Sequence, residues 1–178
     1  MNRSLFILAA VFIAGILFFQ AKEAGAGEFE TRYATVTYFD MKDLREFNDE
    51  LYMGRLRSRY KVQGDTVQDE VGAKIDFIVE RVMTVLDMYP RNLKFLVEIY
   101  PDARKVQQVF RRLYQVDVKY IAFYSPLRDK IFFSADNGRL RVVAHEIGHV
   151  VVENYFTISP PRRIHEVLAQ FAEKHVTD

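Results

Sequence analysis

Two of the four histidines in the chain, His145 and His149, stand four residues apart, with Glu146 between them. On a helix, four residues turn through about 400°, so both imidazoles leave the same face roughly one turn apart. That spacing lets two ring nitrogens reach one Zn²⁺ ion at about 2.0–2.1 Å. Glu146 is rotated by roughly 100° from His145, which places it beside the metal as a general base for water.

The residues around this motif predict a buried helix, because apolar side chains cover most of its surface. These are Val142, Val143, Ile147, Val150, Val151 and Val152. Two histidines and a glutamate inside such a helix are costly unless a partner satisfies them, and a metal ion would do so. The alternative interpretation is a pair of hydrogen-bonded core histidines, with Glu146 at the surface.

A catalytic zinc site has three protein ligands and an open position, so a third ligand is needed. Glu153 is near in sequence but fails on geometry. It lies eight residues after His145, which is about 12 Å along a helix axis and too far for one ion. The third ligand should therefore come from a second helix, which can follow the break at Ser159-Pro160-Pro161.

Glu166 is the predicted third ligand, because it lies in the first turn after this break, seventeen residues past His149. Leu168, Phe171 and Ala172 give this last helix a packing face that seats Glu166 on its inner side. His165 is the alternative, which would give three histidines. Glu173 and His175 lie further along the helix and are expected to face solvent.

Together, His145–His149 and Glu166–Phe171 resemble the gluzincin metallopeptidases, most closely the small bacterial peptidase-MA-type domains. The resemblance covers about residues 116–175. It implies a zincin-like fold with a small N-terminal mixed sheet, an edge strand next to the HExxH helix, and a C-terminal helix pair carrying the metal site. It further implies that the substrate peptide lies along an edge strand formed by Ile131, Phe132, Phe133 and Ser134.

The chain departs from two related patterns. A metzincin needs a glycine and a histidine where this chain has Val152 and Tyr155. Thermolysin-like enzymes carry an acid, four residues after the glutamate ligand, that orients a metal-binding histidine; this chain has Gln170 there. An amide can accept a hydrogen bond from an imidazole N–H but adds no charge, so Gln170 is predicted to orient a metal-binding histidine more weakly than an acid would.

The resemblance implies a zinc endopeptidase that hydrolyses polypeptide substrates with a zinc-activated water and Glu146 as general base. An additional donor to the developing oxyanion is usual in such sites. The candidates are Tyr155, Tyr124, His165 and Arg162. The alternative function is a non-catalytic zinc-binding envelope module, with either a structural metal site or an inactive peptidase-like binding domain; a fourth protein ligand on the metal would favour it.

Hydrophobic periodicity and turn residues predict an α+β domain: a small sheet first, then two helices at the C-terminal end. The pattern around residues 55–64 is polar and predicts a loop. The expected strands are residues 32–39, 93–100, 116–124 and 130–134, and the expected helices are 43–52, 66–88, 102–114, 136–155 and 163–175. Asp136 or Asn137 is the expected cap of the motif helix.

Residues 1–26 have the pattern of a secretory signal peptide: Arg3, an uncharged run over 5–19, and Ala24-Gly25-Ala26 as a cleavage site. The run is short for a membrane span, which needs about 20 residues, so an uncleaved anchor over 5–19 is the alternative. Both interpretations place residues 27–178, a single predicted metallopeptidase domain, outside the cytoplasm, in the periplasm or the extracellular space.

The composition limits the chemistry further. The chain has 178 residues and no cysteine, which excludes disulfides, a thiol nucleophile and cysteine–zinc ligation. The formal net charge is +1, and the short basic groups do not form the clustered positive field that a nucleic-acid partner requires. Any metal must therefore be held by histidines and carboxylates, and the only expected membrane contact is through an uncleaved N-terminal segment.

Overall fold

The computed structural model describes residues 26–178. The predicted signal segment therefore lies outside the described residues, apart from Ala26. Within the described part of the chain, no helix is both long enough and apolar enough to cross a membrane.

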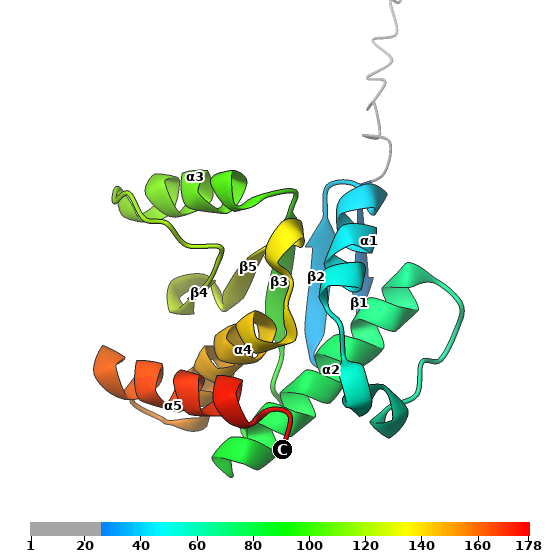
Figure 1. Ribbon diagram of the computed structural model, residues 1–178. Helices are drawn as coiled ribbons and strands as arrows, with labels where there is room; N and C mark the ends of the chain where they lie inside the picture. The colour runs from blue at the N-terminus through cyan, green and yellow to red at the C-terminus, as the bar shows by residue number, and fades with distance from the viewer. Residues whose placement is uncertain (1–25) are drawn as a thin grey trace, which may run out of the picture.

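The domain is an α+β fold built on a five-stranded mixed sheet (Figure 1). The strand order is β1-β2-β3-β5-β4; β2 pairs with β3 and β3 with β5 in parallel, and the two outer pairs are antiparallel. The strand bounds are β1 Gly27–Glu30, β2 Ala34–Tyr38, β3 Phe95–Tyr100, β4 Ala122–Ser125 and β5 Lys130–Ser134.

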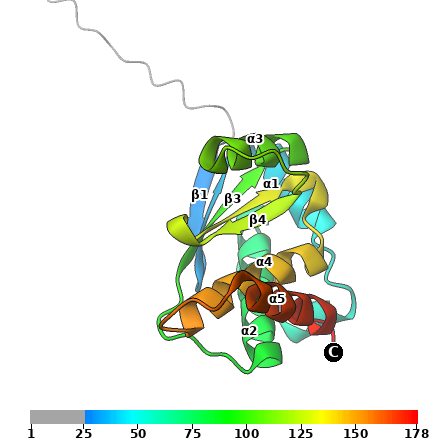
Figure 2. The same ribbon diagram turned by 90° about the vertical axis from the view of Figure 1, so that its left-hand side faces the viewer.

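Helices cover both faces of this sheet. The α-helices are α1 Met41–Glu50, α2 Val67–Leu86, α3 Ala103–Tyr114, α4 Leu140–Tyr155 and α5 Arg162–His175. In Figure 2, α3 lies on one side of the sheet, and α2, α4 and α5 lie on the other. Short 3₁₀ turns occupy Gly54–Arg59, Pro126–Arg128 and Ala135–Asn137.

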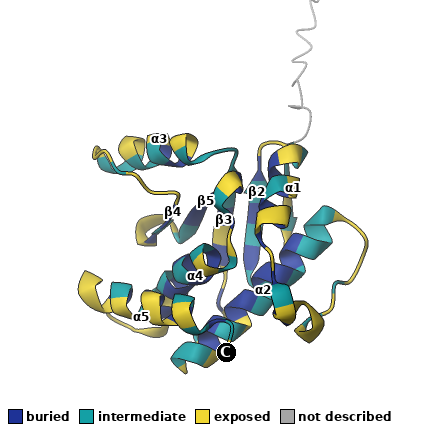
Figure 3. Ribbon diagram, viewed as in Figure 1, coloured by how far each residue is buried: buried dark blue, intermediate teal, exposed yellow. Residues whose placement is uncertain are grey.

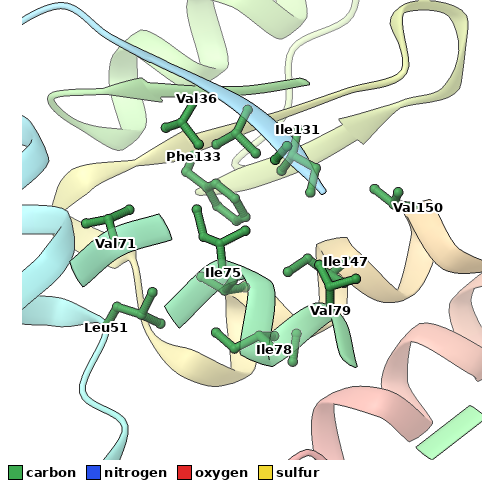
Figure 4. Close-up of a cluster of buried hydrophobic side chains, with 14 of the residues drawn as sticks. Val36, Leu51, Val71, Ile75, Ile78, Val79, Ile131, Phe133, Ile147 and Val150 are labelled. Atoms are coloured by element: carbon green, nitrogen blue, oxygen red, sulfur yellow. The ribbon is translucent and has the colours of Figure 1, made fainter. Parts of the chain in front are cut away.

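The main core lies between the sheet and α2, where alternating strand residues meet the apolar stripe of the helix (Figure 4). Ile75, Ile78 and Val79 of α2 are at most 1% exposed, as their helical spacing predicts. A capping box fixes the start of α2, because Thr66 and Asp69 bond each other's backbone amides. A second, smaller cluster, on the opposite face of the sheet, joins α3 to Phe123 and Phe132.

The predicted helices and strands are confirmed, except that strand β1, Gly27–Glu30, was not predicted; there are four further differences. The strand expected at 116–124 is shorter in the structure, where it begins at Ala122 and ends one residue later than expected, at Ser125. Part of the expected loop at 55–64 is a 3₁₀ turn, anchored by the buried Leu56. Helix α4 begins at Leu140 without a side-chain cap, since Asp136 and Asn137 belong to the preceding 3₁₀ turn.

The fourth difference concerns the edge of the sheet. Residues Lys130–Ser134 were expected to form the edge strand next to the motif helix, but β5 pairs with β3 on one side and β4 on the other. Within residues 26–178 the sheet has two edge strands, β1 and β4, and β4 is the one that contacts α4, so the prediction for Ile131, Phe132, Phe133 and Ser134 is wrong. Those four side chains are at most 3% exposed and pack inside the domain.

Candidate metal centre

Helix α4 carries the motif on a largely buried surface (Figure 3). Val143, Ile147, Val150 and Val151 belong to the main core and Val142 packs against it, while Val152 is also buried. The side chains of His145 and His149 are 21% and 14% exposed and lie on one face, with ring centroids 4.9 Å apart. The helix thus presents two imidazoles, one turn apart, towards a common point.

Gly148 lets α5 approach this face closely. A Cβ atom added at Gly148 would lie 2.9 Å from Cα of Ala169 and 3.3 Å from its Cβ, a contact that only a backbone shift could relieve. The glycine inside α4 costs helix stability relative to alanine, but it brings the middle of α5, at Ala169 and Ala172, against the motif. Glu166 lies one turn before Ala169 on the same helix, so this packing helps to place the predicted third ligand.

The structure brings the three predicted ligands together. One ligand atom from each of His145, His149 and Glu166 lies within 4.8 Å of the other two. The Glu166 carboxylate is 3.8 Å from Nε2 of His145 and 4.0 Å from Nε2 of His149. Ligands on a tetrahedral zinc ion lie roughly 3.4 Å apart, so side-chain shifts of under about 1 Å would close the site. The donor set fits zinc.

Glu173 orients the first of these histidines. Its Oε2 lies 3.1 Å from Nδ1 of His145, so Nδ1 can donate to the carboxylate and leave Nε2 to face Glu166. The expectation that Glu173 faces solvent is therefore wrong. Gln170, predicted to take this orienting part, is exposed on the outer side of α5. His175 stays outside the group and contacts Asp178.

His165, the alternative third ligand, has other partners. Its side chain is buried, and Nε2 lies 3.1 Å from both Oγ of Ser159 and Oε2 of Glu153. Its ring is 5.8 Å from that of His149, and within residues 26–178 it does not join the metal-binding group. Glu153 is likewise no ligand, as its distance along the helix predicts.

Burial favours the neutral forms of two groups in this centre. Burial raises the pKa of Glu146 to about 8; a hydrogen bond from the Tyr124 backbone opposes this, and the carboxylates of Glu166 and Glu173 add to it. Burial, helped by the charge that His145 can carry, lowers the pKa of His149 to about 3. A neutral imidazole is the form that binds a metal.

A cavity of about 630 Å³ opens over these side chains. It is lined by His145, Glu146, His149 and Glu166 and by residues of α3, β4 and the segment between them; in Figures 1 and 2, α4 and α5 lie on one side and α3 and β4 on the other. A volume of this size is typical of a ligand-binding cleft. The metal-binding group is thus accessible from a cleft rather than enclosed by the core.

Three of the four predicted oxyanion donors, His165, Arg162 and Tyr124, line the cavity, and Arg162 lies 3.9 Å from Glu166. The hydroxyl of Tyr124 donates to Asp129 at 2.8 Å, and burial, with this bond, raises the pKa of that hydroxyl. Tyr155 packs on Phe156 and is not among the residues lining the cavity. The hydroxyls of Tyr124 and Tyr155 are therefore not placed at the centre.

Comparisons of the chain with protein-family models, with curated proteins and with solved structures find no match. The fold class stands on the structure itself, as a mixed α+β domain. Any statement of function must rest on the side chains of the centre and on the cleft above it.

Proposed function

We propose that the chain is an extracytoplasmic zinc metallopeptidase of zincin-like fold and gluzincin type. The observation that carries the proposal is the convergence of His145, His149 and Glu166 beside a buried carboxylate, Glu146, in a cleft next to a free sheet edge. Histidine pairs at this spacing on one helix, with a glutamate directly after the first histidine, are typical of zinc peptidases.

Each residue of the centre then has a part. His145, His149 and Glu166 hold Zn²⁺, and Glu173 keeps His145 in the tautomer that offers Nε2. When bound, zinc activates water and polarises the substrate carbonyl. Glu146 takes a proton from the attacking water and later passes it to the leaving amine. Burial raises the pKa of Glu146 in the metal-free protein, and a zinc ion beside it would lower that pKa and favour the carboxylate that accepts the proton.

The free edge of β4 replaces β5 as the predicted substrate edge. The carbonyl of Ile121 accepts from the amide of Ser134 in β5. Because hydrogen-bonding directions alternate along a strand, Ala122 and Tyr124 present their N–H and C=O groups to the open side. The backbone N–H of Tyr124 donates to Glu146, which agrees with this direction and leaves the N–H of Ala122 and the two carbonyl groups for a peptide. An extended peptide can pair with this edge by strand addition.

The number of ligands favours an enzyme over a structural zinc module. In the described residues the group contains three members and His165 is not one of them, which leaves a position for water and substrate. A silent or structural site would need a fourth protein ligand or a blocked cleft. An experiment on the zinc-loaded protein distinguishes these two functions.

The test uses purified residues 27–178, the wild type beside Glu146→Gln, with zinc measured by metal analysis and hydrolysis measured on casein. We expect about one zinc per chain in both proteins, hydrolysis by the wild type, and a loss of about a thousandfold or more in the variant. Glu80→Gln, which changes an exposed acid of α2, is the control and should retain activity. A wild type that binds zinc but cleaves nothing would refute the enzyme.

A second experiment tests the ligand assignment and a third tests the export prediction. Glu166→Ala should lose most of its zinc, and a variant that keeps both zinc and activity would refute the assignment. N-terminal sequencing of the mature protein should find a start at Gly27. A mature chain that still begins at Met1 would favour the uncleaved anchor.

A further inference from the structure

The cleft above the metal-binding group has two unlike sides. One side is polar and carries the histidines and acids of α4 and α5. The other is an apolar wall formed by Phe110, Tyr114, Val116, Val118 and Tyr120, from the end of α3 and the segment that follows it. We call these five residues the wall. None of them is charged, so the cleft separates its polar and apolar surfaces.

The wall is held in place by aromatic packing. The ring of Phe110 contacts those of Tyr114, Tyr120 and Phe123, with centroids 4.6–5.0 Å apart. The hydroxyl of Tyr114 is 2.6 Å from Oγ of the buried Ser125 in β4. The wall is therefore fixed directly to the free edge strand, and it is formed before any ligand binds.

The segment that completes the wall is also anchored, although it has no regular structure. Arg111 bonds Asp117 at 2.6 Å, and the amide of Gln107 donates to the Tyr120 carbonyl. Val116 nevertheless remains 54% exposed and Tyr120 36% exposed. An ordered segment that leaves apolar side chains open towards a cleft is typical of a binding surface.

A peptide paired with β4 would bring its side chains to the wall in alternation. Phe123 of β4 packs on the α3 side of the sheet, while its neighbour Ala122 packs on the opposite side. A peptide that continues the sheet has the same alternation. Of the two residues that flank the cleaved bond, one therefore faces the α3 side, where the wall lies, and the other faces away from it.

We propose that the wall is a specificity subsite, which selects substrates with a bulky apolar or aromatic side chain at one of the two positions flanking the cleaved bond. This inference rests on the proposed peptidase function. A charged side chain at that position would lose its hydration against apolar groups without gaining a partner. The other flanking position faces the polar side and should tolerate many residues.

The test maps cleavage sites in unfolded casein by mass spectrometry and then measures binding to a matched pair of labelled peptides. We expect Phe, Leu, Tyr or Ile to be enriched at one flanking position only. The peptide with Phe there should bind the Glu146→Gln protein about tenfold more tightly than its Asp counterpart, by fluorescence anisotropy. The binding measurement does not depend on turnover.

A matched set of variants assigns the preference to the wall. The double variant Val116→Asn/Val118→Asn should reduce the Phe-over-Asp ratio to about threefold or less. Val167→Asn is the control, because Val167 is 56% exposed, close to the 54% of Val116, but lies outside the cavity. The control should keep the full ratio.

The outcomes separate this inference from the proposed function. Cleavage without apolar enrichment at either position would overturn the subsite and leave the peptidase standing. A double variant that keeps the full ratio would also overturn it. If the zinc-loaded protein cleaves no polypeptide, the proposed function fails and the subsite fails with it.

Discussion

Two clusters of buried polar groups lie on the same side of the sheet, and they are satisfied in different ways. In the first, which we call the Lys74 cluster, Nζ of Lys74 lies 2.8 Å from the Asn48 carbonyl, 2.9 Å from its Oδ1 and 3.2 Å from Glu70. All three ammonium hydrogens have acceptors. Burial acts to raise the pKa of Glu70, but hydrogen bonds from Asn48 and Lys74 lower it.

The metal centre has the opposite character. Burial lowers the pKa of His149 and raises that of Glu146, so the two groups are held neutral rather than paired. One ligand atom from each of His145, His149 and Glu166 lies within 4.8 Å of the other two, and the Glu166 carboxylate also has Arg162 3.9 Å away. The Lys74 cluster therefore joins α1 and α2 with its own side chains, whereas the candidate metal centre presents two neutral imidazoles and a carboxylate that an added cation could bind.

Zinc binding gives the largest expected contrast between the two clusters. At a free zinc concentration about a thousand times the Kd, the ion should raise the free energy of unfolding by about 4 kcal/mol. His149→Gln should abolish this gain, because it removes a ligand, while the Lys74→Met protein should gain as much as the wild type. Thermal unfolding with zinc and with a chelator measures both. An equal gain in His149→Gln would show that zinc binds elsewhere.

The Lys74 cluster should show the next largest effect. Lys74→Met should lower the free energy of unfolding of the metal-free protein by about 3 kcal/mol, because it leaves buried acceptors of Asn48 without a donor. Zinc affinity should stay unchanged. Denaturant unfolding and zinc titration test the two statements, and a large loss of zinc affinity would show that the clusters are coupled.

The stability of the metal-free protein should depend on pH through the groups of the candidate metal centre. Glu146 has a folded-state pKa of about 8, above its unfolded value of roughly 4.3, so between these values only the folded state holds the proton. Its contribution to stability is therefore present at low pH and is lost as the pH rises through about 8. We expect a loss of about 2 kcal/mol between pH 6.5 and 9 that is absent in Glu146→Gln.

His149 acts at the other end of the pH range. Its folded-state pKa of about 3 lies below its unfolded value of roughly 6.5. Only the unfolded state takes up a proton between these values, so stability falls as the pH falls below about 6.5. Denaturant unfolding in chelator across pH 4–9 measures both slopes, and identical curves for wild type and Glu146→Gln would contradict the assignment for Glu146.

The elements that carry these clusters follow from local patterns in the sequence, but the order of the strands does not. Helix α2 is readable from the spacing of Ile75, Val79 and Val82, because each residue depends on neighbours one turn away. The placement of β5 depends on pairing with β3, over thirty residues earlier in the chain. One local signal was available: three consecutive apolar residues, Ile131, Phe132 and Phe133, are typical of a strand buried on both faces.

The three residues of the candidate metal centre were predictable from the sequence, and the residue that supports them was not. Spacing on one helix brings His145 and His149 together, and the break before the next helix suggests Glu166. The part of Glu173 depends on how α5 is rotated against α4, which the contact of Gly148 with Ala169 determines. A signal existed here as well, because Glu166 and Glu173 are seven residues apart, two helical turns, and so share a face.

The smallest expected effect is on zinc affinity, and it tests the hydrogen bond between Glu173 and His145. Glu173→Gln should weaken zinc binding about tenfold, equivalent to about 1.4 kcal/mol, because an amide is a weaker acceptor for Nδ1 of His145 than a carboxylate. Gln170→Ala, four residues after Glu166 but exposed, should leave the affinity unchanged. Competition with a chromogenic chelator measures both. If Gln170→Ala weakens zinc binding more than Glu173→Gln does, α5 is rotated differently and the orienting carboxylate is not Glu173.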